Sequence, residues 1–273
     1  MTEQAERYDR ISEGYAQWWA PVIAPAAVLA LDEVAPAIEA GATRILDVGT
    51  GTGTLAIELL RRWPHARVTA IDASRGMIEE ASGEADRLLS SDQRAHLDLR
   101  VAFADDLPLG DASIDAAVSS FVLQLVPNRF RALREIHRVL RPGGVFGWVS
   151  WLARGGAWAP DDDFDDALED VGEEPREWDD RPGDLRDPAA AVAQMRRAGF
   201  SDVSASAGEL VHPFTIDGFI GFMAEFDEED LVQSFEPDLR TRFDAALRRR
   251  LARRTPDELA MRQPTVTVRG IRR

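Results

Sequence analysis

Residues 44–54, RILDVGTGTGT, decide the fold of this 273-residue chain. The apolar stretch 45–48 has the character of a buried strand, and it runs into a turn where glycine occupies every second position from Gly49 to Gly53. A helix follows at 54–62. Glycines allow the backbone to approach a ligand closely, and open α/β sheets bind ligands at the carboxyl ends of their strands. We therefore expect a ligand site at this turn.

Strands and helices alternate along the rest of the chain. Buried apolar strands that alternate with helices indicate a doubly wound, mainly parallel sheet. Before the first strand, the pattern predicts two helices, at 5–19 and about 25–40. The further expected elements are strands at 44–48, 67–71, 98–102, 114–119 and 145–150, helices at 54–62, 75–90, 128–140 and 188–198, a short strand near 201–207, helical segments through about 259, and a final strand at 265–269.

The segment 152–187 carries most of the excess negative charge of the chain. It holds fourteen Asp and Glu residues against four Arg, and its Gly and Pro residues indicate an irregular connection. Two interpretations stay open, a solvated charged loop and a lid over the site. The basic stretch 240–254 is expected to be a solvated helix face that balances this insertion rather than a nucleic-acid patch.

One catalytic unit with four parts is the expected organisation. The parts are N-terminal cap helices at 1–43, a cofactor-binding α/β core at 44–151, the acidic insertion at 152–187, and, at 188–273, the remainder of the α/β domain with a helical substrate cap.

Composition excludes several kinds of chemistry. The chain has no cysteine, and all 32 of its basic Lys and Arg side chains are arginine, so disulfides, thiolate nucleophiles and lysine Schiff bases are excluded. A net charge of −16 opposes affinity for phosphate backbones. No stretch reaches the roughly 20 apolar residues of a membrane span, and the N-terminus lacks a secretory pattern, so we expect a cytoplasmic protein. No spacing of His and carboxylates predicts a metal site.

Two aspartates accompany the glycine turn. Asp47 lies two residues before the first glycine, where it suits a ligand with a cationic ammonium group better than a pyrophosphate. Asp72 ends the next strand, where it can accept from both hydroxyls of a ribose, although an aspartate there can also cap the following helix. Dinucleotide-binding turns space their glycines as G-x-G-x-x-G, whereas here the third glycine comes one residue early. The pattern therefore favours a nucleoside that carries an ammonium group.

Five motifs in order resemble the class I S-adenosylmethionine-dependent methyltransferases, in particular the small-molecule branch similar to ubiquinone and menaquinone biosynthesis methyltransferases. The resemblance implies a Rossmann-like seven-stranded sheet, mostly parallel with an antiparallel last strand, and S-adenosyl-L-methionine as the cofactor. The motifs are the segments 45–53, 68–74, 104–108, 113–118 and 133–144.

By this resemblance, the cofactor contacts run along the carboxyl edge of the first four strands. Asp47 and Gly49 would hold the methionine end, Asp72 the ribose, and Met77 would pack near the adenine. The full implied set is Asp47, Gly49, Thr50, Gly51, Gly53, Asp72, Ala73, Met77, Ala104, Asp105, Ser120 and Phe121.

Two departures from the family pattern affect the site. Phe103 stands where the family often has an acid that accepts from the adenine amino group, and Asp105 is the alternative acceptor. Leu125 stands where the family often has the histidine of a Leu-x-His pattern, which removes one candidate acid or base.

The resemblance predicts an enzyme that methylates a small, apolar or aromatic molecule. Acceptor contacts are expected from Tyr15, Trp18, Trp19 and Trp151, whose alternative role is that of core aromatics. No residue is singled out as a catalytic base, because the methyl group of a sulfonium is already activated and needs mainly alignment and exclusion of water. A protein or RNA methyltransferase and a cofactor-binding protein without transfer are the alternatives, and the acceptor atom and oligomeric state stay open.

Overall fold

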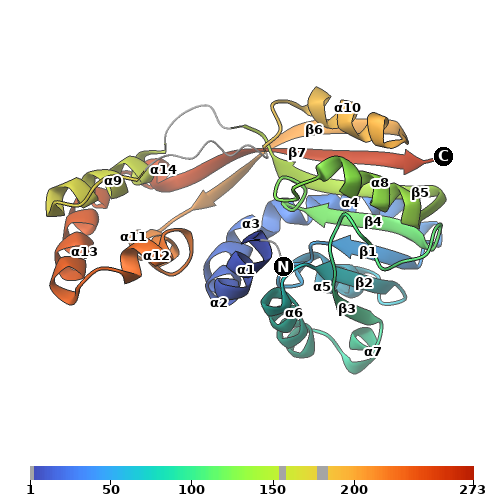
Figure 1. The fold of residues 1–273 in the computed structure, drawn as a ribbon, viewed down its shortest axis with the longest axis horizontal. Helices are drawn as coiled ribbons and strands as arrows, with labels where there is room; N and C mark the ends of the chain where they lie inside the picture. Colours follow the sequence, from blue (N-terminus) through green and yellow to red (C-terminus); the bar gives the residue numbers. More distant parts are fainter. Residues whose placement is uncertain (1–2, 154–157, 177–183) are drawn as a thin grey trace.

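The computed structural model describes residues 3–153, 158–176 and 184–273 of the chain. Its centre is a seven-stranded sheet in which β7 is antiparallel to both of its neighbours while the other strands run parallel. This arrangement confirms the expected α/β fold class (Figure 1). The strands, in their order across the sheet, are β3 (Leu97–Val101), β2 (Arg67–Asp72), β1 (Arg44–Val48), β4 (Ile114–Ser120), β5 (Leu140–Trp151), β7 (Ala260–Arg272) and β6 (Phe200–Pro213).

Both faces of the sheet are covered because its central strands are apolar on both sides. In β1, Ile45 belongs to one hydrophobic cluster and Leu46 to the other, as expected for side chains that alternate between two faces. The Ile45 cluster includes side chains of α4 (Leu29–Glu39) and α5 (Thr54–Arg62). The Leu46 cluster includes side chains of α8 (Arg129–Val139) and α10 (Pro188–Ala198). Two further helices, α6 (Arg75–Leu88) and α7 (Ser91–Arg94), lie between β2 and β3 in the chain.

The last two strands are longer than the sequence pattern predicts. β6 covers residues 200–213 instead of 201–207, and β7 covers 260–272 instead of 265–269. β5 pairs with β7 only as far as Thr265, and beyond it β6 and β7 continue as a two-stranded ribbon. Apolar and polar side chains alternate only weakly in this ribbon, so the sequence pattern predicted strands that are too short. Antiparallel pairing nevertheless satisfies the backbone hydrogen bonds there.

The ribbon leads to a helical lobe at the left of Figure 1, which we call the cap lobe. Phe164 and Phe243, from two of its helices, pack edge to face with ring centroids 5.1 Å apart. The cap lobe comprises α9 (Ala159–Val171), α11 (Ile216–Phe222), the π-helix η2 (Met223–Asp227), α12 (Glu229–Gln233), α13 (Pro237–Leu251) and α14 (Pro256–Leu259).

The described part of the acidic insertion is helical rather than irregular. Its helix, α9, pairs with the basic side chains of α13 and the turn after it: Arg250 donates to Asp166 at 2.6 Å and to Asp170 at 2.9 Å, and Arg254 donates to Asp163 at 2.7 Å. The expected charge balance between these segments is thereby confirmed. The prediction of an irregular connection was wrong for 159–171, because ion pairs with residues far away in the same chain stabilise a helix that local composition disfavours. Residues 154–157 and 177–183 lie outside the described part.

The N-terminal segment is broken into several short helices. The expected helix 5–19 consists of α1 (Glu3–Arg10), α2 (Ser12–Gly14) and the π-helix η1 (Tyr15–Trp19), and the expected helix 25–40 is divided between α3 (Ala20–Ala27) and α4. Gly14 marks a close approach, because a Cβ there would lie 2.1 Å from the carbonyl oxygen of Glu225. Within the described residues no single helix is long and apolar enough to cross a membrane, although the bent pair Ser12–Ala27 and Leu29–Glu39 passes by length and composition alone.

Candidate active site

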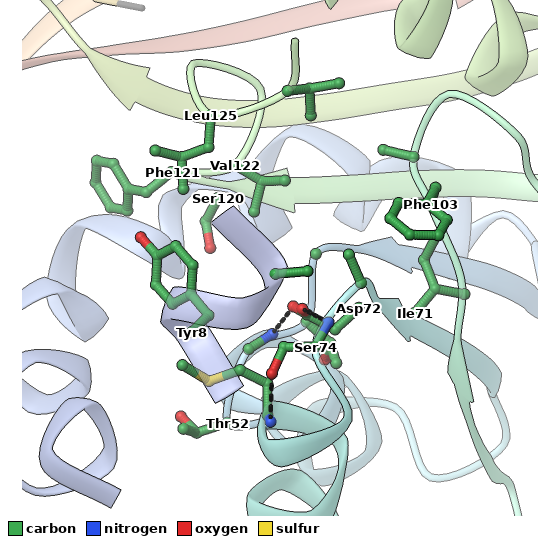
Figure 2. A pocket seen from close by; sticks show the side chains of 18 of the residues that line it. Tyr8, Thr52, Ile71, Asp72, Ser74, Phe103, Ser120, Phe121, Val122 and Leu125 are labelled. Carbon is green, nitrogen blue, oxygen red and sulfur yellow. Dashed lines mark hydrogen bonds between the residues drawn. The ribbon is translucent and has the colours of Figure 1, made fainter. Parts of the chain in front are cut away.

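A cavity lies at the carboxyl ends of β1, β2 and β4, beneath the N-terminal helices. It has a volume of about 1120 Å³, part of which is open to solvent, and Figure 2 shows the side chains around it. Its wall comes from four regions far apart in sequence. They are Ala5, Tyr8, Tyr15, Ile23 and Ala27 of the N-terminal helices; 49–52 and Thr54 of the first turn; 71–74, Met77 and 102–105 around the second and third strands; and 120–122 with 125–127 after β4.

The glycine turn bends as its sequence predicts. Gly49, Gly51 and Gly53 all have positive φ values, of 70°, 53° and 88°, which side chains with a Cβ rarely adopt. A Cβ on Gly49 would lie 2.3 Å from the Val122 side chain, so only glycine allows the turn to pack against the segment after β4. A Cβ on Gly51 would meet only Tyr15, at 3.9 Å. The backbone at Gly51 is therefore open toward the cavity.

Asp47 lies fully buried beneath this turn. Its Oδ2 accepts a hydrogen bond from Thr50 Oγ1 at 2.7 Å, while its Oδ1 has no hydrogen-bond partner among the described residues. Burial, with the charge of Asp72 acting in the same direction, raises the pKa of Asp47 to about 7 despite the lowering effect of the Thr50 hydroxyl. Asp47 does not itself line the cavity, but Gly49 and Thr50 above it do. An unsatisfied buried carboxylate oxygen fits the expected cationic ammonium group.

Asp72 joins the two ligand-facing turns. Its Oδ2 accepts from the Gly51 amide at 2.9 Å and its Oδ1 from the Ser74 amide at 3.0 Å, and Figure 2 shows both bonds at the cavity wall. Burial raises the pKa of Asp72. The N-cap of α6 is Ser74, whose Oγ accepts from the Met77 amide at 3.0 Å. The alternative of Asp72 as the cap of that helix was therefore wrong, and its carboxylate faces the cavity.

The structure brings together ten of the twelve expected cofactor residues at the cavity wall; Asp47 and Gly53 lie behind it. Phe121 has a φ of 54° at the end of β4, a strained conformation for a residue with a side chain. Its ring stacks on Trp151 with centroids 4.0 Å apart. Wall residues outside the expected set of contacts include Tyr8, Ile23, Ser74, Val122 and Leu125. Ser74 lies within the motif 68–74, and Val122 and Leu125 follow soon after the expected Phe121, whereas Tyr8 and Ile23 reach the site only through tertiary packing.

The expected acceptor residues divide into two groups. Tyr15 lines the cavity, while Trp18, Trp19 and Trp151 do not. Trp19 stacks on Phe226 of the cap lobe at 5.7 Å and lies 6.2 Å from Trp151. Trp18 donates from Nε1 to Glu225 at 2.6 Å. The three tryptophans thus form an aromatic junction between the N-terminal helices, β5 and the cap lobe, an arrangement that favours the alternative of core aromatics.

Tyr15 lines the cavity close to the glycine turn, with its ring 3.9 Å from the Cβ position of Gly51. Its ring lies edge to face with Tyr8 at 5.9 Å and with Phe226 at 5.7 Å. Burial, together with the nearby Tyr8 and Asp72, raises the pKa of the Tyr15 phenol. The hydroxyl is therefore protonated at neutral pH and can donate a hydrogen bond to a bound molecule.

Together, the doubly wound sheet, the glycine turn and the two strand-end aspartates define a nucleoside-binding α/β domain. Residues 46–147 match the family model described as a methyltransferase domain. The chain is 37% identical to the ubiquinone/menaquinone biosynthesis C-methyltransferase UbiE of Geotalea daltonii over 102 residues, which cover 37% of this chain and 42% of that protein. It is 39% identical over 106 residues to a malonyl-acyl-carrier-protein O-methyltransferase of Geobacter sulfurreducens, covering 39% of this chain and 38% of that protein. The matched region thus spans less than half the length of these relatives.

Solved structures extend the likeness of fold to the whole chain. The crystal structure of the cyclase SpnF superimposes with a TM-score of 0.62 at 20% identity, covering 98% of this chain and 95% of that one. A phosphoethanolamine N-methyltransferase of Haemonchus contortus gives a TM-score of 0.57 at 15% identity, covering 100% of this chain and 60% of that one. These likenesses concern the fold alone. With the family match, they confirm the expected resemblance to class I methyltransferases for the α/β core.

Proposed function

We propose that this protein binds S-adenosyl-L-methionine in the cavity and transfers its methyl group to a small, mainly apolar acceptor. One observation carries the proposal: the buried Oδ1 of Asp47 accepts no hydrogen bond from the described residues and lies beneath a glycine turn whose Gly51 amide is bonded to Asp72. A ligand with an ammonium group and a ribose supplies what both carboxylates need. The match of residues 46–147 to a methyltransferase domain supports the same activity.

Each end of the cofactor has a proposed partner. Asp47 would hold the ammonium group, with the Gly49–Gly51 backbone against the methionine portion. Asp72 retains acceptor capacity beyond its two backbone bonds and would hold the ribose hydroxyls. Met77, Ala104 and Asp105 would enclose the adenine. When bound, the cofactor supplies an activated methyl group, and the protein aligns it and excludes water.

The acceptor is proposed to lie on the apolar side of the cavity. Ile23, Ala27, Phe121 and Leu125 line that side, and ligand sites combine such apolar walls with a few placed polar groups. Tyr15 would supply one of them as a hydrogen-bond donor. The net charge of −16 supports a small-molecule acceptor rather than nucleic acid.

Calorimetry with S-adenosylmethionine, S-adenosylhomocysteine and NAD tests the cofactor. We expect the first two to bind and NAD to fail, because the third glycine of the turn comes too early for a dinucleotide. Micromolar binding of NAD without binding of the sulfonium would reject the proposal. Transfer of labelled methyl groups into a metabolite extract then tests the reaction, and binding without transfer to any fraction would favour a cofactor-binding protein instead.

A further inference from the structure

Helix α1 forms part of the cavity wall; Asp9 joins it to the start of α6, and Arg10 lies 3.7 Å from Asp230 of the cap lobe in an ion pair. Ala5 and Tyr8 of this helix line the cavity, and the next residue, Asp9, faces the start of α6. A single oxygen of Asp9, Oδ1, accepts from the Ser74 hydroxyl at 2.6 Å and from the Gly76 amide at 2.9 Å. These two bonds hold the pKa of Asp9 below its ordinary value. The N-terminal segment is thus attached by a charged hydrogen-bond acceptor beside the cavity.

The contact is close because residue 76 has no side chain. A Cβ on Gly76 would lie 3.1 Å from the carbonyl oxygen of Asp9 and 3.0 Å from the hydroxyl of Ser12. Such contacts are tighter than ordinary van der Waals distances, so an alanine would require the Asp9 backbone to shift by a few tenths of an ångström away from α6. Gly83 on the same helix has no atom within 4 Å of its Cβ position.

The bonded partner of Asp9 also orders the ligand-facing turn. Ser74 donates its amide to Asp72 and accepts the Met77 amide on its hydroxyl oxygen. Asp72 and Met77 both line the cavity, and Figure 2 shows Ser74 beside Asp72 with Tyr8 on the neighbouring helix. The fastening of α1 and the geometry of the proposed ribose site therefore share one serine.

We propose that Asp9 is a positioning residue that holds α1 closed over the cavity, so that the nucleoside ligand enters and leaves only when the bonds to Ser74 and Gly76 break. The inference rests on the proposed binding of S-adenosylmethionine. Hydrogen bonds to a charged group are stronger than neutral ones, so the Asp9 carboxylate holds α1 firmly against the start of α6. Asp9 acts on the ligand through α1 and Ser74 and does not need to touch it.

The test measures association and dissociation rates of S-adenosylhomocysteine by stopped-flow fluorescence in four variants. Asp9→Ala should raise both rates about tenfold, because losing hydrogen bonds to a charged group of this kind costs more than about 1.4 kcal/mol, which is one factor of ten. Asp9→Asn should give rates between those of the wild type and Asp9→Ala, since its amide oxygen can accept both bonds but carries no charge. Gly76→Ala changes the α6 side of the same contact and should also raise both rates. Gly83→Ala, elsewhere on α6, should leave them unchanged.

The variants separate the possible outcomes. Glycine to alanine within a helix is otherwise stabilising, so faster exchange in Gly76→Ala would not come from loss of folding. If wild-type protein fails to bind S-adenosylhomocysteine, the proposed function itself is rejected, and with it the role proposed for Asp9. If wild-type protein binds it but Asp9→Ala and Gly76→Ala exchange ligand at the wild-type rates, or if only dissociation accelerates, α1 is not a gate and the inference is overturned.

Discussion

Asp47 and Asp72 end neighbouring parallel strands, and the charge of Asp72 raises the pKa of the buried Asp47. The two carboxylates are placed differently. Asp72 accepts hydrogen bonds from two backbone amides at the cavity wall, whereas one oxygen of the buried Asp47 accepts none within the part of the chain that the structure describes. A cation bound beside Asp47 would relieve the repulsion between the two carboxylates. Its binding should therefore depend on the protonation state of Asp47 and hence on pH.

Cofactor affinity should fall in acid. The pKa of Asp47 is raised to about 7 in the free protein, so below pH 7 the group takes up a proton and no longer attracts an ammonium group. Above pH 7 the carboxylate is charged and affinity should be level. The dissociation constant for S-adenosylhomocysteine should rise by about tenfold per pH unit below 7, the limit for one coupled proton. Calorimetry from pH 5.5 to 8 checks this, and Asp47→Asn should remove the dependence. A level profile in the wild-type protein would exclude Asp47 from ammonium binding.

Replacing Asp72 by alanine should weaken S-adenosylhomocysteine binding by roughly 1 to 3 kcal/mol, the usual cost of leaving polar partners unpaired. The melting temperature should also fall, because the amides of Gly51 and Ser74 lose their acceptor. Asp72→Asn retains acceptor oxygen and serves as the matched control, with a smaller loss of both quantities. Unchanged affinity in Asp72→Ala would mean that the ribose is held elsewhere.

The adenine end is tested at Phe103 and Asp105, which both line the cavity. Asp105→Ala should weaken the adenosyl ligand, since Asp105 is the proposed acceptor for the adenine amino group. Phe103→Asp should preserve binding, because it places an acid where related enzymes often carry one. Normal binding by Asp105→Ala, measured by calorimetry, would show that backbone and packing recognise the adenine without this carboxylate.

The aromatic junction should behave as core. Trp151→Ala should lower the free energy of unfolding by about 3 to 5 kcal/mol, the usual cost of deleting a buried tryptophan, since Trp151 stacks on Phe121 and packs against Trp19. Cofactor binding and turnover should then fail together. Leu125→Ala is the contrasting variant, because Leu125 lines the cavity and should reduce acceptor turnover more than stability. If Trp151→Ala loses turnover alone at an unchanged melting temperature, the tryptophans contact the acceptor after all.

The sequence by itself determined the α/β core and the residues around the proposed cofactor. The strand 44–48 and the helix 54–62 were predicted at the bounds that the structure has, because apolar periodicity and glycine conformation act within a few residues. Asp72 was indicated by its position at the end of the second strand, and Ala104 and Asp105 by the resemblance to the methyltransferase motifs; all three line the cavity. Their proposed contacts with the cofactor stay predictions.

Only the tertiary structure decided the N-terminal roof, the β6 and β7 ribbon, and the use of the tryptophans. Asp9 meets Ser74 across 65 positions of sequence, so no local pattern indicates that pair. Composition indicated that the segments of Arg254 and Asp163 balance each other in charge, but only the fold decided that these two residues pair across 91 positions. The sequence around Trp19 and Trp151 does not distinguish a tryptophan that contacts a ligand from one that packs in the core. Which surface a large apolar side chain covers is set by the segments that pack against it, and those are brought together only when the chain folds.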